Sequence, residues 1–223
     1  MSTSFVKLCF GRLGDGDDGL QMVGNNGVRL VAGALRGRRI DVPNQASLRP
    51  TPGMLRETLF NWLQGHVEGA CGLDVCAGSG ALGFEALSRG AASMTFIERS
   101  KKAIAAMETN AARFALSNAT MLCGDARCVL DRLAVQRMRY DLVFLDPPFD
   151  NPQLLVQLVD RLLSARLISP GGWLYVERPV CEAVLSKPRL RLHRQSRCGL
   201  SLGSLYMVDK DDMVDDTADE VCS

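Results

Sequence analysis

The chain has 223 residues, of which 47% are hydrophobic, and its formal net charge is +1. This length suits one domain with a small appendage, and the apolar share is enough for a sizeable core. The eight cysteines include no C-x-x-C pair and the two histidines lie far apart, which argues against a structural zinc site. We expect a reduced, cytoplasmic protein without a signal peptide or a membrane contact, because no apolar run approaches transmembrane length.

Composition divides the chain into segments of different character. Residues 1–27 are rich in Gly and Asp without periodicity and are expected to be disordered. Residues 28–66 predict an N-terminal hairpin and helix, and residues 67–208 predict the main domain. Residues 209–223 form an acidic run, which is typical of a solvated, disordered tail.

The N-terminal extension combines strand and helix signals. Residues 28–43 show two short β-like runs around Gly33 and Gly37, which favour a hairpin. A helix should then begin with Thr51 as its N-cap and Pro52 at its first position. The following apolar residues share one face of that helix: Leu55, Leu59, Trp62 and Leu63.

From residue 70 onward, apolar strands alternate with helical segments. The expected strands are 71–75, 93–98, 119–125, 140–146 and 171–177. The expected helices are 80–90, 101–116, one from 126 and 151–164. Residues 190–196 and 202–208 resemble a closing antiparallel pair. Uniformly apolar strands between helices predict an α/β fold with a mostly parallel, seven-stranded sheet covered by helices on both faces.

A glycine-rich turn follows the first of these strands. Gly78, Gly80 and Gly83 have the spacing G-x-G-x-x-G, and Glu98 ends the next strand. The glycines would let the backbone approach a nucleoside ligand, and the carboxylate could accept hydrogen bonds from ribose hydroxyls. The alternative is that these glycines serve only a tight turn and close packing.

The nature of this ligand depends on Asp74. In a dinucleotide fold the strand runs straight into the glycines and the helix N-terminus meets a pyrophosphate. Asp74 stands four residues before Gly78, where a carboxylate would repel pyrophosphate but suit an ammonium group. This favours S-adenosylmethionine over NAD. Asp125, followed by Ala126, could accept a hydrogen bond from the adenine amino group, or could simply cap a helix.

The stretch DPPF ends the fourth strand with an acid, two prolines and a ring. An amine on a nucleobase is a poor nucleophile because its lone pair is delocalised into the ring. Asp146 and the carbonyl of Pro147 could accept its two N–H groups, with Pro147 and Pro148 fixing the direction of the carbonyl. Phe149 could stack on a flipped base. The alternative is a strand-terminating turn with a core phenylalanine.

These residues resemble a known family. DPPF and the loop from Asp74 to Gly83 resemble class I S-adenosylmethionine-dependent amino-methyltransferases. More narrowly, the segments RLVAGALRGRRIDVP, LRPT, RETLFNWL, AGSGALGFEALSRGA and LDPPF resemble RsmD-type 16S ribosomal RNA guanine-N2 methyltransferases. DPPF alone is shared with many DNA and RNA amino-methyltransferases. The arginine-rich hairpin joined to LRPT and RETLFNWL is much more specific to this family than DPPF is.

The resemblance implies a Rossmann-like class I methyltransferase fold and methyl transfer from S-adenosylmethionine, leaving S-adenosylhomocysteine. The acceptor would be the N2 amine of one guanine in 16S ribosomal RNA, within a partly assembled small subunit. We expect a monomer and no metal. The alternative hypotheses are a DNA adenine-N6 or cytosine-N4 methyltransferase, an NAD-dependent oxidoreductase, and a non-catalytic RNA-binding module.

The resemblance also implies roles for residues that match its motifs by position. Those for the cofactor are Asp74, Gly78, Gly80, Glu98, Asp125 and Ala126, and those for catalysis are Asp146, Pro147 and Phe149. Arg49 to Thr51 should lie near the cofactor and the target base. The chain departs from the family pattern at Gly53-Met54, where we expect an Asp-Arg pair. It departs again in its last strand, so no role is assigned beyond residue 180.

Arginines are concentrated in the N-terminal extension. Arg29, Arg36, Arg38 and Arg39 could merely keep a hairpin soluble. Beside a base-modifying site, we interpret them as contacts to RNA phosphates that position the substrate. Arg49 and Thr51 complete the predicted RNA-binding set.

Overall fold

A computed structural model describes residues 27–42, 53–181 and 185–210. Its strands are β1 Val28–Arg29, β2 Arg39–Ile40, β3 Cys71–Val75, β4 Ser93–Glu98, β5 Ala119–Cys123, β6 Tyr140–Leu145, β7 Ile168–Pro179, β8 Leu190–Cys198 and β9 Ser201–Val208. Its helices are α1 Gly53–Trp62, α2 Ala81–Ser88, α3 Lys101–Arg113, α4 Ala126–Val135 and α5 Pro152–Ser164. The predicted elements of the main domain are therefore confirmed, with small shifts at their ends.

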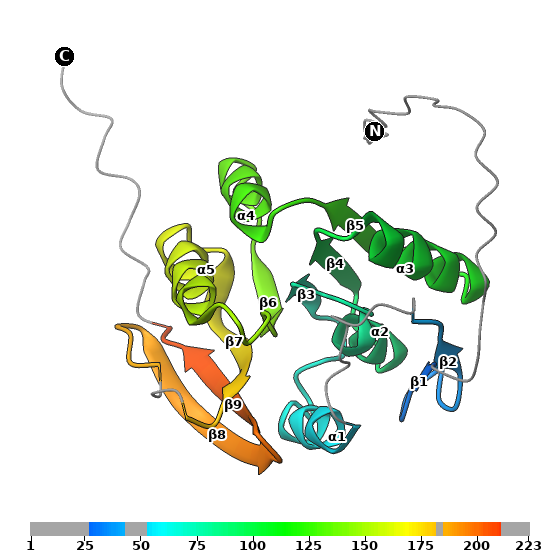
Figure 1. Cartoon of the computed structure of the whole chain (residues 1–223), viewed down its shortest axis with the longest axis horizontal. Helices are drawn as coiled ribbons and strands as arrows, with labels where there is room; N and C mark the ends of the chain where they lie inside the picture. Colours follow the sequence, from blue (N-terminus) through cyan, green and yellow to red (C-terminus); the bar gives the residue numbers. More distant parts are fainter. Residues whose placement is uncertain (1–26, 43–52, 182–184, 211–223) are drawn as a thin grey trace.

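The main sheet has seven strands in the order β5-β4-β3-β6-β7-β9-β8 (Figure 1). Strands β3 to β7 pair in parallel, and β9 pairs antiparallel with both β7 and β8. This confirms the predicted parallel sheet with a closing antiparallel pair. The carboxyl ends of the parallel strands meet at one edge of the sheet, which we call the rim. After β3 the chain adds β4 and β5 on one side of it and then crosses to add β6 on the other side, and ligands collect at such a reversal of strand order.

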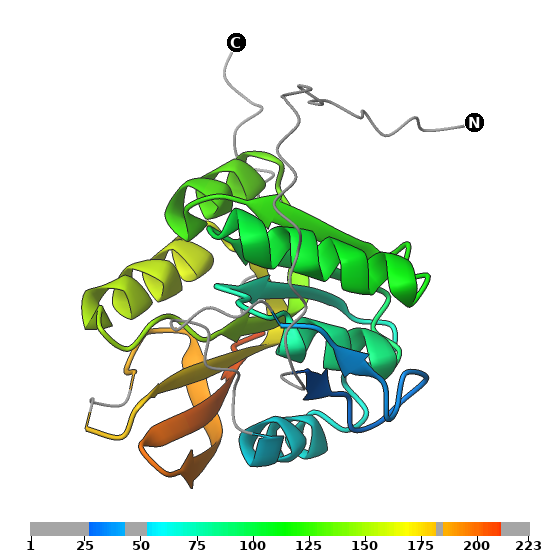
Figure 2. The same cartoon turned by 45° about the vertical axis from the view of Figure 1, so that its right-hand side comes forward.

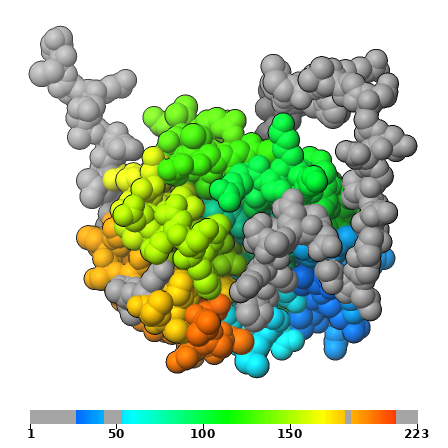
Figure 3. All heavy atoms as spheres, in the orientation of Figure 1, coloured from blue at the N-terminus to red at the C-terminus, as the bar shows by residue number. Residues whose placement is uncertain are grey.

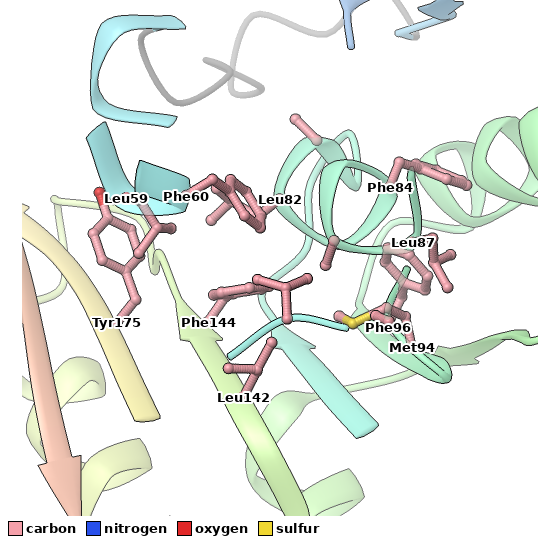
Figure 4. Close-up of a cluster of buried hydrophobic side chains, with 14 of the residues drawn as sticks. Leu59, Phe60, Leu82, Phe84, Leu87, Met94, Phe96, Leu142, Phe144 and Tyr175 are labelled. Carbon is pink, nitrogen blue, oxygen red and sulfur yellow. The ribbon is translucent and has the colours of Figure 1, made fainter. Parts of the chain in front are cut away.

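Helices cover both faces of the sheet (Figures 1 and 2). Helices α1, α2 and α3 pack with the hairpin on one face, and α4 and α5 pack on the other. Figure 4 shows Leu59 and Phe60 of α1 beside Phe144 and Tyr175 of the sheet. The rings of Phe60 and Phe144 meet edge to face with centroids 5.9 Å apart. Helix α1 is thereby fixed against the strand that leads into DPPF.

The N-terminal hairpin is held on helix α2 by hydrogen bonds from the hairpin backbone to a side chain of the helix. The fully buried Glu85 accepts from the N–H groups of Val31 at 2.9 Å and Ala32 at 3.1 Å. Gly33 lies in the left-handed region at φ +79°, and a Cβ there would stand 1.7 Å from the carbonyl oxygen of Ser88. Only glycine allows this approach. The predicted hairpin is confirmed, and its loop is an integral part of the domain.

No helix within the described ranges is both long enough and apolar enough to span a lipid bilayer.

Candidate active site at the carboxyl ends of the strands

The strand register places the predicted acids side by side at the rim. Val75 of β3 is in register with Ile97 of β4 and Leu145 of β6. One residue further along each strand come Cys76, Glu98 and Asp146. Neighbouring strands are about 4.8 Å apart, so the two carboxylates flank Cys76 at the same level. The fold thus brings together Glu98 and Asp146, which lie 48 positions apart in the chain.

Cys76 marks the centre of this acidic rim. Its backbone lies in the left-handed region at φ 63°, which is uncommon for a residue with a side chain. Burial, together with the charges of Glu98, Asp146 and Asp74, raises the pKa of its thiol to about 12. The thiol therefore stays protonated, and three of the four predicted rim acids lie close enough to act on it.

Asp74 is buried beneath the glycine-rich turn, with 2% of its surface exposed. Its Oδ2 accepts a hydrogen bond from the backbone N–H of Gly83, 3.0 Å away in the first turn of α2. Burial raises the pKa of this carboxyl to about 8, against the lowering effect of the Gly83 bond. A cation placed beside it would favour the ionised form. The site therefore fits a positively charged group.

Glu98 fixes the turn that contains the glycines. Its Oε2 accepts from the N–H of Gly78 at 2.9 Å, and its Oε1 accepts from the N–H of Ser100 at 2.8 Å. Gly78 and Gly80 both have positive φ, at 55° and 75°. Because a carboxylate has about four acceptor positions, Glu98 keeps capacity for two hydroxyl groups. The loop is thus held in shape before any ligand arrives.

Asp125 is the N-cap of helix α4, the alternative that the sequence left open. It accepts from the backbone N–H of Arg127 at 2.9 Å, and the Arg127 guanidinium binds both carboxylate oxygens. These bonds lower the pKa of Asp125 to about 2. Asp125 and Ala126 lie at the rim, two and three residues beyond Cys123, which is in register with Glu98. A contact with adenine there remains a prediction and is compatible with the cap.

The DPPF motif ends β6 at the rim. Asp146 is half-buried, Pro147 is buried and Phe149 is 40% exposed. A small pocket lies between this motif and the end of β7, where Glu177 and Arg178 line it. Phe149 is thus available for stacking. The alternative of a core phenylalanine is not what the structure shows.

Glu177 and Arg178 are rim residues that sequence reasoning missed. Val176 is in register with Leu145, so Glu177 lies level with Asp146 on the neighbouring strand. Both side chains are almost fully buried. Burial raises the pKa of Tyr175 well above its ordinary value, with the charges of Glu177 and Asp146 acting in the same direction. The sequence signal for them was two charged residues directly after the apolar run 173–176, the same pattern that predicted the other rim acids.

The predicted RNA-binding arginines are exposed where they are described. Arg29, Arg36, Arg38 and Arg39 all lie on the hairpin surface, and the guanidinium of Arg38 lies 5.5 Å from the ring centroid of Phe114. Arg49 and Thr51 lie outside the described residues, as does Pro52.

Arg56 has a structural place in the fold. Its side chain is buried, its Nη2 donates to the carbonyl of Arg29 at 2.7 Å, and its Nε lies 3.8 Å from Glu85. Burial lowers the pKa of this guanidinium. Arg56 therefore ties α1 to the hairpin and to α2, and it is not available to RNA.

Comparison with known proteins gives consistent results along the chain. The family model described as Conserved hypothetical protein 95 matches residues 28–207. The Ribosomal RNA small subunit methyltransferase D of Escherichia coli K12 is 36% identical over 184 residues, covering 82% of this chain and 91% of that protein. The protein of the same name from Haemophilus influenzae is 33% identical over 187 residues, covering 80% and 93%.

Solved structures agree with this result. A candidate methyltransferase from Escherichia coli, yhhF, superimposes with a TM-score of 0.73 at 36% identity, covering 82% of this chain and 98% of the other. A candidate methylase from Haemophilus influenzae has a TM-score of 0.69 at 30% identity, covering 82% and 99%. The chain therefore belongs to the Conserved hypothetical protein 95 family, the RsmD family, and is a methyl-transferring enzyme.

Proposed function

We propose that this enzyme methylates the exocyclic N2 amine of one guanine in small-subunit ribosomal RNA. The observation that carries the proposal is the arrangement of DPPF at the rim. Asp146 stands level with Glu98 across β3, beside a buried Pro147 and an exposed Phe149. Relatives that cover most of the chain are named small-subunit ribosomal RNA methyltransferases, which supports the choice of substrate.

The residues at the rim fit S-adenosylmethionine. Asp74 offers a buried carboxyl to the ammonium group, and Glu98 offers its remaining acceptor positions to the ribose hydroxyls. Asp125 and Ala126 would lie beside the adenine. When bound, this cofactor supplies an electrophilic methyl group on a sulfonium and leaves as S-adenosylhomocysteine. The glycine turn needs no rearrangement, because Glu98 already holds it.

The DPPF residues would act on the amine. Asp146 accepts one N–H of the guanine amine, and the carbonyl of Pro147 accepts the other. These two acceptors draw the nitrogen lone pair out of conjugation and aim it at the methyl group, and their fixed positions stabilise the developing charge. Phe149 stacks on the base and holds its plane. As the N–CH3 bond forms and the S–CH3 bond breaks, Asp146 receives the departing proton.

The exposed arginines of the hairpin would bind phosphates of the same RNA. Their contacts position the substrate without reading its sequence. We expect the enzyme to act as a monomer on a partly assembled small subunit, without a metal.

Labelling tests the proposal directly. The enzyme is incubated with methyl-labelled S-adenosylmethionine and small ribosomal subunits that lack the modification, and the nucleosides are then analysed by mass spectrometry. We expect label in N2-methylguanosine at one position. The proposal is wrong if no label enters guanine. Label in adenine or cytosine of duplex DNA, supplied in a parallel reaction, would favour a DNA amino-methyltransferase instead.

A further inference from the structure

The edge of the sheet farthest from the cofactor residues is strongly basic. Residues 185–208, which include β8 and β9, contain five cationic side chains and no Asp or Glu. The cationic residues are Lys187, Arg189, Arg191, Arg194 and Arg197. The whole chain carries a formal net charge of only +1, so this excess is local. A polyanion is the partner that such a surface suits.

Three of these arginines are exposed along β8 itself. Arg191 is paired with Asp209 at 3.0 Å, and Arg197 donates to the carbonyl of Gly199 at 2.9 Å. The side chain of Arg194 forms no hydrogen bond or ion pair with any of the described residues. Its guanidinium thus keeps its full donor set for a ligand, and Arg197 has donors beyond the one it uses.

The register connects this strand with the active site. Arg197 of β8 is opposite Leu202 of β9, and Leu202 is opposite Arg178 of β7. Arg178 lines the pocket beside Pro147 and Phe149. Two strand spacings separate Arg197 from Arg178, or about 10 Å between their backbones. Arg194 lies three residues earlier on β8, about 10 Å further from the rim. Because side chains alternate along a strand, it projects from the opposite face of the sheet to Arg197.

Strand β8 also adjoins the elements that carry the hairpin. Helix α1 contacts β8, and Arg56 of α1 donates to the hairpin at Arg29. Figure 3 shows these parts in a row along the lower edge of one face: β8 and β9 in orange, α1 in cyan and the hairpin in blue. An RNA that contacts the hairpin and extends beyond DPPF therefore reaches β8.

We infer that β8 is a second RNA-binding surface, where Arg194 and Arg197 bind phosphates of the strand that presents the target guanine. This inference rests on the proposed function. The two arginines would bind backbone that flanks the flipped base and passes around the β8 edge of the sheet, Arg197 on the face of the pocket and Arg194 on the face of α1. The hairpin would bind the backbone on the other side of the pocket. Phosphate contacts on both sides of the pocket fix the RNA backbone while the target base unstacks.

Edge protection offers another explanation for the same charges. Cationic side chains on an edge strand discourage pairing with a second copy of the chain. That role predicts association of the protein when the charges are removed, and it predicts no change in RNA affinity. The two explanations therefore differ in what a substitution changes.

The test compares two double variants that lose the same charge. In Arg194→Ala/Arg197→Ala the charge is removed from β8. In Arg132→Ala/Arg139→Ala it is removed from exposed positions on α4 and just before β6, away from the hairpin and β8. Binding of a 16S ribosomal RNA transcript is measured across a range of salt concentrations, together with kcat and KM on small subunits that lack the modification. Thermal unfolding and S-adenosylmethionine binding verify that each variant is folded.

For the β8 variant we expect a salt slope smaller by about 1 to 2, because each phosphate contact contributes about 0.7 to 0.9. The KM for the subunit should rise while kcat at saturation and cofactor affinity stay unchanged. The control variant should match the wild type. Arg194→Lys/Arg197→Lys should restore the salt slope, because a phosphate contact requires charge and a merely structural role would not be rescued in this way.

An unchanged salt slope in the β8 variant overturns the inference. So does association of the variant, by sedimentation, with unaltered RNA affinity, which would establish edge protection. Equal losses in the β8 and control variants would also overturn it, because net charge alone would then explain them. Failure of the proposed function would appear separately, as an absence of label in guanine from the wild-type enzyme.

Discussion

At the rim, Asp74 and Glu98 are buried and accept hydrogen bonds from backbone N–H groups. In the hairpin, the arginine side chains are exposed, and other residues hold the backbone in place. At the rim, the functional side chains themselves fix the loop, because Glu98 accepts from Gly78 and Ser100. At the hairpin, the fixing is done by Glu85, which touches no proposed ligand. The exposed guanidinium groups then keep their donors.

This difference fits the two kinds of ligand. A small cofactor needs acceptors at fixed positions, and burial among hydrogen bonds supplies them. A phosphate backbone needs positive charge on a surface of the right shape, and its contacts tolerate mobile side chains. A substitution in one region should therefore change the affinity for that region's ligand and leave the affinity for the other ligand unchanged. A substitution that changes both affinities would show that the two regions are coupled.

The largest effect should come from Glu85→Ala. It leaves the N–H groups of Val31 and Ala32 without their acceptor and removes the carboxylate beside Arg56 and Arg89. Breaking a buried ion pair costs about 3–5 kcal/mol of the free energy of unfolding. Urea denaturation measures the loss.

Glu108→Ala, on the exposed side of α3, serves as its control and should change stability by less than about 0.5 kcal/mol. RNA affinity should fall in the folded Glu85 variant while cofactor affinity stays. Equal loss of both affinities would mean that the hairpin and the rim are one cooperative unit.

Asp146→Ala tests the rim alone. It removes an acceptor that acts on the amine in the transition state, so turnover should fall about 10²- to 10³-fold. Single-turnover kinetics with saturating subunits measures this, and calorimetry should show S-adenosylmethionine binding largely intact. Activity within about threefold of the wild type would exclude Asp146 from the proposed role.

Two glycines of the hairpin loop provide a matched pair. Gly33 and Gly37 have nearly equal φ, +79° and +82°, so alanine carries a similar conformational cost of about 1–2 kcal/mol at each. They differ in space, because the new Cβ meets the Ser88 carbonyl oxygen at 1.7 Å in one case and Arg29 Nη2 at 3.4 Å in the other. Gly33→Ala should therefore cost about 1–3 kcal/mol more than Gly37→Ala in urea denaturation. It should also weaken RNA binding more. Equal effects would mean that the loop is not docked as described.

The last prediction is a pH dependence from Asp74. Its pKa is raised from 3.8 to about 8 in the folded protein, so the folded state binds more protons between these values. The contribution of Asp74 to the free energy of unfolding should therefore fall as pH rises from about 4 to 8, by at most about 1.4 kcal/mol per pH unit. Asp74→Asn should remove this decline. Parallel stability curves for the variant and the wild type, between pH 5 and 8.5, would contradict the assignment.

The sequence predicted the sheet and most of the rim because both depend on local patterns. An acid after an apolar strand is visible in the chain at Asp74, Glu98, Asp125 and Asp146, and parallel pairing brings such residues together. Glu177 and Arg178 carry the same signal, but the predicted strand 171–177 ends at Glu177 without assigning it a role, whereas β7 continues to Pro179.

Glu85 could not have been predicted in this way. It lies on α2, all of whose residues are buried, and a charge there has no local explanation. Its partners are 54 and 53 residues earlier in the chain, on backbone N–H groups that any residue would offer. The burial of Arg56 follows from the same long-range contact. Only the folded arrangement identifies these residues.

The distance along the chain between Val31 and Glu85 has a consequence for synthesis. The hairpin is made first, but the acceptor for its backbone lies 54 residues later. At about 5–20 residues per second, translation leaves a delay on the order of 3–10 s before that acceptor exists. During this interval the arginine-rich hairpin is attached to the ribosome without the helix that orients it. The RNA-binding surface is therefore completed late, after β3 and α2 have been made.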